Sequence, residues 1–350
     1  MQTGITYALL AAALFGASTP FAKMLVDDIS PVMLAGLLYL GSGIGLAAWM
    51  VVRRMANGNR PDKGSRLTSG DLPWLAGAIA AGGIAGPVLL MIGLTNTPAS
   101  SASLLLNLEG VLTALMAWFV FKENVDRRVA LGMGLIVAAG LLLAWNERPV
   151  AGPPWGAIAI AAACLCWAVD NNLTRKVSAG DAVQIAGIKG IAAGSVNLGI
   201  AFLMDYRMPD TVAVLCAGVI GFCGYGLSLV LFVLALRNLG TARTGAYFSV
   251  APFVGAVVSM ALLQDTPGTA FWVAALLMAA GIWLHITEIH SHSHAHEEMF
   301  HNHPHRHDAH HQHTHDFPWD GKEPHVHPHR HAPLVHSHPH VPDIHHRHRH

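Results

Sequence analysis

Ten stretches of this chain are long and apolar enough to cross a lipid bilayer as helices. A bilayer core of about 30 Å needs about 20 apolar residues in a helix. The chain is 53% hydrophobic and only 12% charged, against about 25% charged residues in a typical soluble domain. The sequence therefore predicts an all-α integral membrane protein with ten transmembrane helices. The predicted spans are about 3–25, 31–52, 73–94, 99–121, 129–145, 155–174, 182–203, 211–236, 242–263 and 269–289.

Basic residues fall mainly in alternate loops of this ten-span order. The loops after the second, fourth, sixth and eighth spans are rich in Lys and Arg, and the other loops hold few. Basic residues favour the cytoplasmic side, so we expect a plasma-membrane protein of the bacterial inner-membrane type with both termini in the cytoplasm. One span more or fewer would break this agreement. The basic residues of the rich loops are Arg53, Arg54, Arg60, Lys63, Arg66, Lys122, Arg127, Arg128, Arg175, Lys176, Arg237 and Arg243.

The two halves of the apolar part resemble each other. Phe15 precedes Lys23 by eight positions in the first span, and Trp167 precedes Arg175 by eight positions in the sixth. Each half holds five spans, and an odd number means that the second copy enters the membrane in the opposite direction. Inverted repeats are typical of transporters, with the substrate site near the midplane between the repeats. The predicted divisions are a first repeat at 3–145, a second repeat at 153–289 and a tail at 290–350.

These features resemble the EamA type of the drug/metabolite transporter superfamily. The resemblance covers about residues 3–289 and implies a ten-helix inner-membrane carrier, often an exporter of small metabolites. That family usually has a proline in the fourth span of the second half, present here as Pro252. The corresponding place in the first half holds Glu109-Gly110, which puts a carboxylate where a kink is expected. The segments that carry the resemblance are Leu14-Phe-Gly through Lys23, Cys166-Trp-Ala through Arg175, Trp118-Phe-Val-Phe-Lys-Glu123 and Ala261-Leu-Leu-Gln-Asp265.

Glu109 is the first candidate for a transport role, because it is an ionisable residue near the middle of the fourth span. A carboxylate at that depth has to pair, take up a proton or face water. It is a candidate for binding a cation or for carrying a coupling proton. The structural alternative is a pair with a neighbouring helix.

A second set of polar residues lies in the sixth and seventh spans. Counted from the short turn between these spans, Asp170 and Lys189 each lie about 10 Å deep at 1.5 Å per residue, so we expect a buried ion pair. The pair is either functional or purely structural, and Lys189 has Glu109 or an anionic substrate as alternative partners. The other candidate path residues are Asn171, Asn107 and Trp167. Asparagines within spans more often hydrogen-bond to a neighbouring helix than bind substrate. Tryptophans near spans often pack against other helices or anchor at the membrane interface.

All 24 histidines lie between His285 and His350, so the composition of the tail differs from that of the spans. Seven prolines and few apolar residues leave it without a core, and we expect it to be disordered without metal. Neutral imidazole binds Zn, Ni, Co and Cu, through sites that form by wrapping and weaken as the pH falls towards 6. The candidate metal ligands are His290, His292, His294, His296, His301, His303, His305, His307, His325, His327, His329, His331, His336, His338, His340, His345, His346, His348 and His350.

Three functions are consistent with this layout. The first is an exporter of divalent transition metals that the tail collects, with a path through Glu109. The second is a secondary active exporter of a small metabolite, whose tail senses or buffers metal. The third is a metal store that does not transport, which the ten-span repeat argues against. A metal path needs several His, Cys or acidic ligands per site, and their scarcity in the spans favours the second.

Other classes of function are excluded or left open by the same data. The sequence contains no enzyme motif or nucleotide-binding motif, and its formal net charge is zero. We therefore expect no enzymatic activity, no required cofactor and no nucleic acid partner. The expected partners are the lipid bilayer, a small-molecule substrate and divalent metal ions, and a homodimer is left open.

Overall fold

The computed structural model describes residues 2–56, 69–121, 127–146, 153–177, 181–239, 244 and 247–286, together with the backbone of 290–296, 299–305, 325–331 and 334–340. The chain divides into two units, Met1–Glu288 and Ile289–His350. Some residues named above lie outside the described part, namely Arg60, Lys63, Arg66, Lys122, Glu123, Arg243, His307, His345, His346, His348 and His350.

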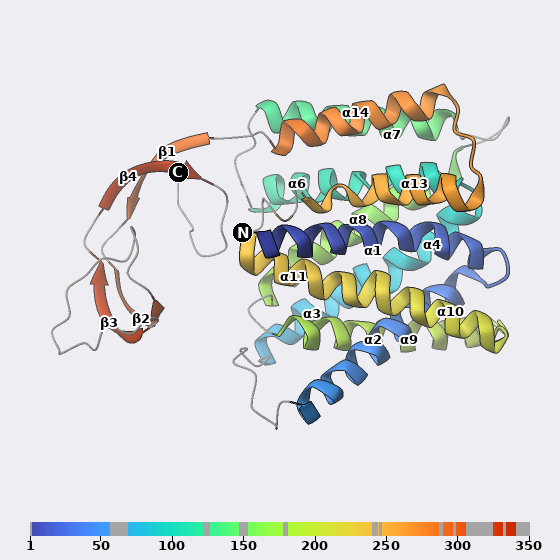
Figure 1. Ribbon diagram of the computed structural model, residues 1–350, viewed down its shortest axis with the longest axis horizontal. Helices are drawn as coiled ribbons and strands as arrows, with labels where there is room; N and C mark the ends of the chain where they lie inside the picture. The colour runs from blue at the N-terminus through green and yellow to red at the C-terminus, as the bar shows by residue number, and fades with distance from the viewer. Residues whose placement is uncertain are drawn as a thin grey trace. The chain divides into compact units, whose positions relative to one another are not determined.

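The first unit is built of helices that run roughly side by side (Figure 1). Several begin where local chemistry favours a start: Pro31 opens the second helix, and Asp181 and Asp210 cap the helices that follow them by accepting hydrogen bonds from Val183 N and Val212 N, each at 2.8 Å. The helices are α1 Gln2–Val26, α2 Pro31–Ala56, η1 Ser69–Asp71, α3 Leu72–Ala78, η2 Ile79–Ala85, α4 Gly86–Thr95, α5 Ala99–Leu105, α6 Leu108–Phe121, α7 Arg127–Asn146, α8 Trp155–Val177, α9 Ala182–Leu203, α10 Thr211–Gly221, η3 Phe222–Leu227, α11 Ser228–Leu239, α13 Ala251–Leu263 and α14 Thr269–Ile286.

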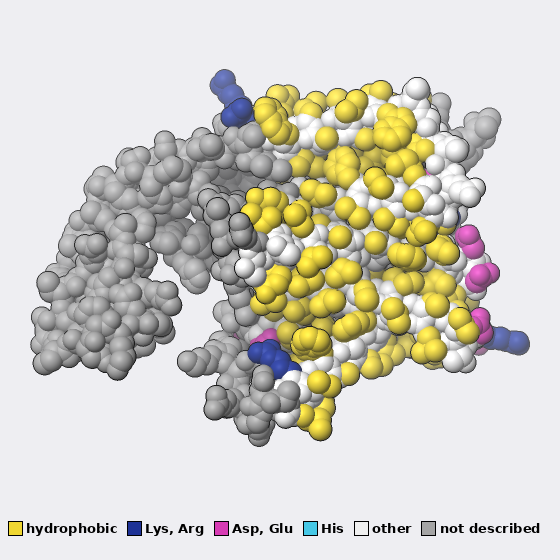
Figure 2. Space-filling view, in the orientation of Figure 1, with side chains coloured by type: hydrophobic (Ala, Val, Ile, Leu, Met, Phe, Trp, Pro, Cys, Tyr) yellow, Lys and Arg dark blue, Asp and Glu magenta, His cyan; other side chains and the backbone are white. Residues whose placement is uncertain are grey.

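These helices fall on the ten predicted spans. Seven helical stretches are long and apolar enough to cross a membrane, and three more apolar helices, Ala130–Asn146, Ala251–Leu263 and Thr269–Leu284, are shorter. Apolar side chains cover the face shown in Figure 2, and charged side chains lie towards its ends. Leu203 and Leu276 are 86% and 71% exposed. An apolar exterior of this extent is what a lipid-facing surface requires, and the all-α membrane fold predicted from the sequence is confirmed.

The two halves pack against each other in a reciprocal way. The second helices of the halves, α2 and α9, pack together, and so do the fifth helices, α7 and α14. The first helix of each half lies against the third and fourth spans of the other half: α1 packs on α11 and α13, and α8 packs on α4 and α6. Two similar halves related by a two-fold axis produce this exchange of partners. The packing therefore agrees with the predicted five-plus-five repeat.

The third and fourth spans are irregular at equivalent places in the two halves. Each third span contains a π-helical segment, η2 in the first half and η3 in the second. The fourth span of the first half turns at Leu106 and Asn107, between α5 and α6, and that of the second half turns at Ser249 and Val250, just before α13 and its Pro252. Such irregularities leave backbone groups without helical partners, and they often mark functional sites.

Glycines allow the backbones of the two halves to touch. A Cβ atom added to Gly221 of α10 would clash with the carbonyl oxygen of Leu38 on α2, and one added to Gly190 of α9 would lie 2.6 Å from the nitrogen of Gly43 on α2. Small residues at such contacts are the usual way for membrane helices to approach closely. The helix α2 is therefore held against both α9 and α10 of the other half.

The tail unit carries four strands, β1 His290–His296, β2 Met299–His305, β3 His325–His331 and β4 Leu334–His340. In this unit β1 pairs antiparallel with β4, and β2 pairs antiparallel with β3. We expected a tail that is disordered without metal and forms metal sites by wrapping. The described segments differ from that expectation in having paired backbones. Histidine alternates with other residues in these segments, which matches the two-residue period of a strand. The lack of a hydrophobic core does not exclude strands of this kind.

Replacing Gly221 with Ala should destabilise the helical unit by about 1–3 kcal/mol, the usual cost of forcing extra atoms into a tight contact. The matched control is Gly218→Ala on the same helix, where an added Cβ meets nothing within 4 Å. Melting temperatures of the purified variants in detergent measure the difference. Equal losses for both variants would show that α2 and α10 do not approach as closely as described.

Candidate substrate and ion path

Glu109 lies in the first turn of α6, directly after the break in the fourth span. Its side chain is half-buried. The break frees backbone N–H groups at the start of α6, and the positive end of the helix dipole stabilises a carboxylate placed there. The chain can therefore keep an acid in the middle of an apolar span.

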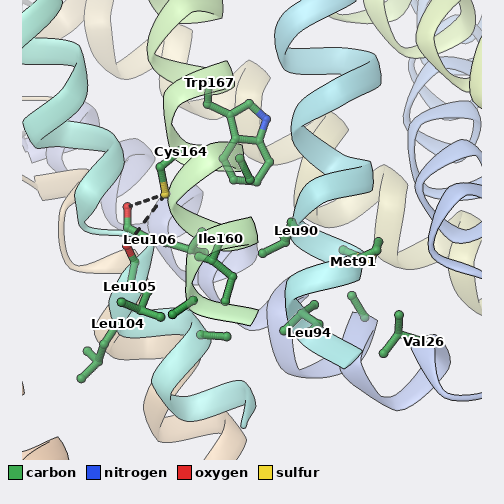
Figure 3. Packing of buried hydrophobic residues seen from close by; sticks show 14 of the residues in the cluster. Val26, Leu90, Met91, Leu94, Leu104, Leu105, Leu106, Ile160, Cys164 and Trp167 are labelled. Atoms are coloured by element: carbon green, nitrogen blue, oxygen red, sulfur yellow. Dashed lines mark hydrogen bonds between the residues drawn. The ribbon is translucent and has the colours of Figure 1, made fainter. Parts of the chain in front are cut away.

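Two side chains contact carbonyl groups at the end of α5, next to the break. The Asn107 amide donates to the carbonyl oxygen of Leu104 at 3.0 Å and lies 3.5 Å from the sulfur of Met278. The buried thiol of Cys164 on α8 lies 3.8 Å from the carbonyl oxygen of Leu105 (Figure 3). Asn107, a predicted path residue, thus uses its amide to stabilise the break next to Glu109.

The carboxylate of Glu109 meets the sixth span through Asn171. The amide nitrogen of Asn171 donates to Oε1 of Glu109 at 2.8 Å. Asn171 itself is exposed on α8. Among the residues whose side chains are described, no Lys or Arg forms an ion pair with Glu109. Glu109 therefore has a hydrogen-bond donor beside it and no described counter-charge.

The predicted ion pair between the sixth and seventh spans is present. The Lys189 ammonium on α9 lies 2.5 Å and 2.7 Å from the two carboxylate oxygens of Asp170 on α8. Thr174 donates its hydroxyl to Asp170 at 2.7 Å and lies 3.2 Å from the Lys189 nitrogen. Both charged residues are buried, each 7% exposed. Two opposite charges in direct contact, with a third group bonded to both, leave this cluster electrically neutral.

Backbone carbonyl groups of the π-helical segment η2 accept hydrogen bonds from side chains next to this polar cluster. The carbonyl oxygen of Gly82 accepts hydrogen bonds from the Tyr39 hydroxyl at 2.7 Å and from the indole nitrogen of Trp167 at 3.0 Å. The next carbonyl, that of Gly83, accepts from Asn197 at 3.2 Å. Helices α2, α8 and α9 thus bind backbone groups that a regular α-helix would have paired internally.

The side chain of Asp170 fills the space beside Gly82, so a Cβ atom at that position would clash with the carboxylate. The second half repeats this arrangement: a Cβ on Gly224 of η3 would clash with Ser18 of α1. Each π-helical segment therefore receives a polar side chain from the first helix of the other half. Glycine is required in both places because the neighbouring side chain occupies the space of a methyl group.

Aromatic rings join the two halves next to this polar cluster. Phe15 and Trp167, which correspond in the repeat, meet edge to face with centroids 6.3 Å apart. Phe15 also contacts Tyr225 at 6.1 Å and Phe248 at 5.6 Å, and Tyr39 contacts Tyr225 at 5.4 Å. Rings at these distances attract one another. They form an apolar wall on the contact between the two halves.

Three of the six predicted path residues, Trp167, Asp170 and Asn171, lie on α8. Two more contact that helix from its neighbours, Glu109 from α6 and Lys189 from α9. Tyr39, Thr174 and Gly82 also belong to this cluster and were not singled out as site residues from the sequence. A tyrosine in the middle of the second span was the available signal for Tyr39. Gly82 had no such signal, because nothing in the sequence marks the carbonyl of a π-helical segment.

The helical unit shows no preformed site for a metal ion in its described side chains. No three His, Cys, Asp or Glu side chains gather there within reach of one ion. Zinc sites in proteins usually combine three or four such ligands. The cluster around α8 offers instead one neutral ion pair, one further carboxylate and several neutral hydrogen-bonding groups.

Replacing Lys189 with Met should cost about 3–5 kcal/mol of stability, because it leaves the buried carboxylate of Asp170 without its counter-charge. Adding Asp170→Asn to that variant should recover part of the loss, since both charges are then gone. Melting temperatures of the parent, the single variant and the double variant in detergent test this. A single variant as stable as the parent would show that the pair does not form in the membrane protein.

Comparison with known proteins agrees with the fold and the repeat. The chain is 25% identical over 293 residues to a transporter of Methanothermobacter thermautotrophicus, covering 79% of this chain and 84% of that protein. It is 24% identical over 273 residues to the inner membrane transporter YedA of Escherichia coli K12, covering 76% and 85%. A solved crystal structure matches with a TM-score of 0.59 at 17% identity, covering 81% of this chain and 96% of that one, which supports the fold.

The family profile repeats along the chain as the packing does. The profile of the EamA-like transporter family matches residues 2–145 and again residues 154–287, so it covers both halves and ends before the strands of the tail. The two matches together cover well over half of the chain. The chain is a multi-pass membrane protein and belongs to the EamA-like transporter family.

Proposed function

We propose that this chain is a secondary active exporter of a small metabolite, and that its substrate passes between the two halves beside α8. The observation that carries the proposal is that Glu109 of α6 and Lys189 of α9 meet Asn171 and Asp170 of α8, at the contact between the repeats. Substrate and ion sites of inverted-repeat transporters lie at such contacts, where helices are discontinuous.

The charges of this cluster suggest separate roles for its two acids. Asp170 is neutralised by Lys189, with Thr174 bonded to both. Glu109 accepts a hydrogen bond from the amide of Asn171, and none of the described Lys or Arg side chains forms an ion pair with it. A carboxylate at membrane depth without a counter-charge attracts a cation or a proton. We assign to Glu109 the binding of the coupling proton or of a cationic group on the substrate.

The tail has a supporting role in this proposal. It binds divalent metal ions of the Zn, Ni, Co and Cu group through neutral imidazoles, and it acts as a metal sensor or buffer for a carrier of something else. The alternative in which the spans export the metal itself has less support, because the described helical side chains hold no group of three metal ligands.

Glu109→Gln should abolish export while leaving the protein in the membrane, because glutamine keeps the shape and a hydrogen-bond acceptor but cannot carry charge or a proton. The experiment compares the culture medium of cells expressing the parent, the variant and an empty vector, with metabolites measured by mass spectrometry and Zn, Ni and Co by elemental analysis. We expect at least one organic solute to accumulate with the parent only, at equal membrane levels of both proteins.

Two results would contradict the proposal. A variant that exports as well as the parent would remove Glu109 from the mechanism. Accumulation of a metal ion in the medium, with no organic solute, would favour metal export. Treating the cells with a proton ionophore adds a test of energy source, since export driven by a proton gradient should fall to the empty-vector level.

We further propose that the protein lies in the plasma membrane with both termini in the cytoplasm, as the basic loops indicate. A green fluorescent protein fused after His350 should then fluoresce, and alkaline phosphatase fused at the same place should be inactive, because each enzyme or fluorophore matures on one side only. The reverse pair of results would place the tail outside the cell and overturn this orientation.

A further inference from the structure

The two ladders of the tail place histidines directly opposite histidines. In the first ladder, His292 lies opposite His338, and in the second, His303 lies opposite His327. Three such pairs occur in each ladder. The pairs are His290 with His340, His292 with His338 and His294 with His336 in the first ladder, and His301 with His329, His303 with His327 and His305 with His325 in the second.

The pairs of one ladder all belong to one face. Side chains alternate between the two faces of a strand, so residues two positions apart share a face. In an antiparallel pair, residues directly opposite each other share that face too, with Cβ atoms about 4.5–5.5 Å apart. The six paired histidines of each ladder are therefore assigned by register to a single face.

The spacing of histidines along the sequence gives a second argument for this register. The alternation changes phase between His296 and His301 in the first arm of the tail, and between His331 and His336 in the second arm, in both cases by a gap of five positions. In both arms this change of phase falls between the two described strands, β1 and β2 in the first arm and β3 and β4 in the second. The five-residue gap occurs in both arms at places that the register sets opposite each other. Histidines therefore remain opposite histidines in the second ladder as in the first.

We infer that each ladder is a binding site for a divalent metal ion of the zinc class, built from neighbouring cross-strand histidine pairs. Two neighbouring pairs place four histidines at adjacent register positions, and four is the number of ligands in a closed tetrahedral zinc site. One ladder therefore binds at least one ion, and the tail at least two. This inference rests on the proposed metal binding by the tail and replaces its wrapped sites with register-defined ones. It does not depend on which solute the helices carry.

The test shifts the histidines of one strand to the other face without changing composition. The shifted variant exchanges neighbours in β1, by His290→Ser, Ser291→His, His292→Ser, Ser293→His, His294→Ala and Ala295→His. The compensated variant adds the matching exchange in β4, by Val335→His, His336→Val, Ser337→His, His338→Ser, Pro339→His and His340→Pro. In the compensated variant every shifted histidine again has a histidine opposite it, at positions 291 and 339, 293 and 337, and 295 and 335.

Zinc binding is measured on the full-length protein in lipid nanodiscs, by titration of Zn²⁺ against a competing fluorescent chelator. We expect the shifted variant to lose affinity at one class of site by at least about 10–100-fold, the cost of losing even a supporting partner of a metal ligand, and the compensated variant to recover it. The second ladder, unchanged in both variants, should bind as in the parent.

Equal affinities in all three proteins would mean that the tail wraps around metal without a register, and would overturn the inference. A compensated variant that stays as weak as the shifted one would overturn it as well, because pairing would then not be what matters. Glu109→Gln measured in the same way should bind Zn²⁺ like the parent. Failure of the export proposal is thereby distinguished from failure of the ladder sites.

Discussion

Direct backbone contact of the second span with glycines of the seventh and eighth spans holds the two halves of this transporter together. Gly43 of α2 lies against Gly190 of α9, and Leu38 of α2 lies against Gly221 of α10. Lipid gives no hydrophobic force between helices, so close packing and buried polar contacts have to supply the association. These contacts bring α2, α8, α9 and η2 within reach of one another. The polar cluster on α8 depends on that approach.

The irregular backbone of the third and fourth spans supplies hydrogen-bonding groups at the contact between the halves. At η2, the carbonyl oxygens of Gly82 and Gly83 accept hydrogen bonds from Tyr39, Trp167 and Asn197. At the break before α6, the side chains of Asn107 and Cys164 contact the carbonyl groups of Leu104 and Leu105, and Glu109 lies in the first turn of α6. Non-helical backbone is tolerated at membrane depth only where protein or a water-filled cavity covers it. The irregular backbone has to be covered by adjacent helices, and the side chains that cover it form a polar site between those helices.

Much of this arrangement could be predicted from the sequence, because membrane depth is nearly a one-dimensional property. Counting residues from the turn between the sixth and seventh spans placed Asp170 and Lys189 at the same depth and predicted their ion pair, with Glu109 or a substrate as the other possible partners of Lys189. The basic loops, the repeat and the ten apolar stretches fixed the span order for the same reason. The partner of Glu109 was not predictable in this way, since which face of α8 meets α6 depends on packing in three dimensions.

Other features were missed for physical reasons of the same kind. The involvement of Tyr39 and Gly82 follows from a π-helical segment, and its extra residue per turn leaves no distinct pattern in the sequence. The strands of the tail were missed because the absence of a hydrophobic core was weighed above the two-residue period of its histidines. Their pairing across the two arms became visible only when the register placed residues 290–305 opposite 325–340.

If the substrate passes between the halves beside α8, as proposed, Glu109 and Asn171 face a water-filled path there. This central claim is tested most directly by labelling a single cysteine, Asn171→Cys, with a small membrane-impermeant thiol reagent in a variant whose Cys164, Cys166, Cys216 and Cys223 are replaced. Leu165→Cys, an exposed apolar position on the same helix, is the control for a lipid-facing surface. The account predicts that the cysteine at position 171 reacts from the aqueous phase and that the one at position 165 does not. Reaction of position 171 only with a lipid-soluble reagent would place Asn171 against lipid and contradict the path.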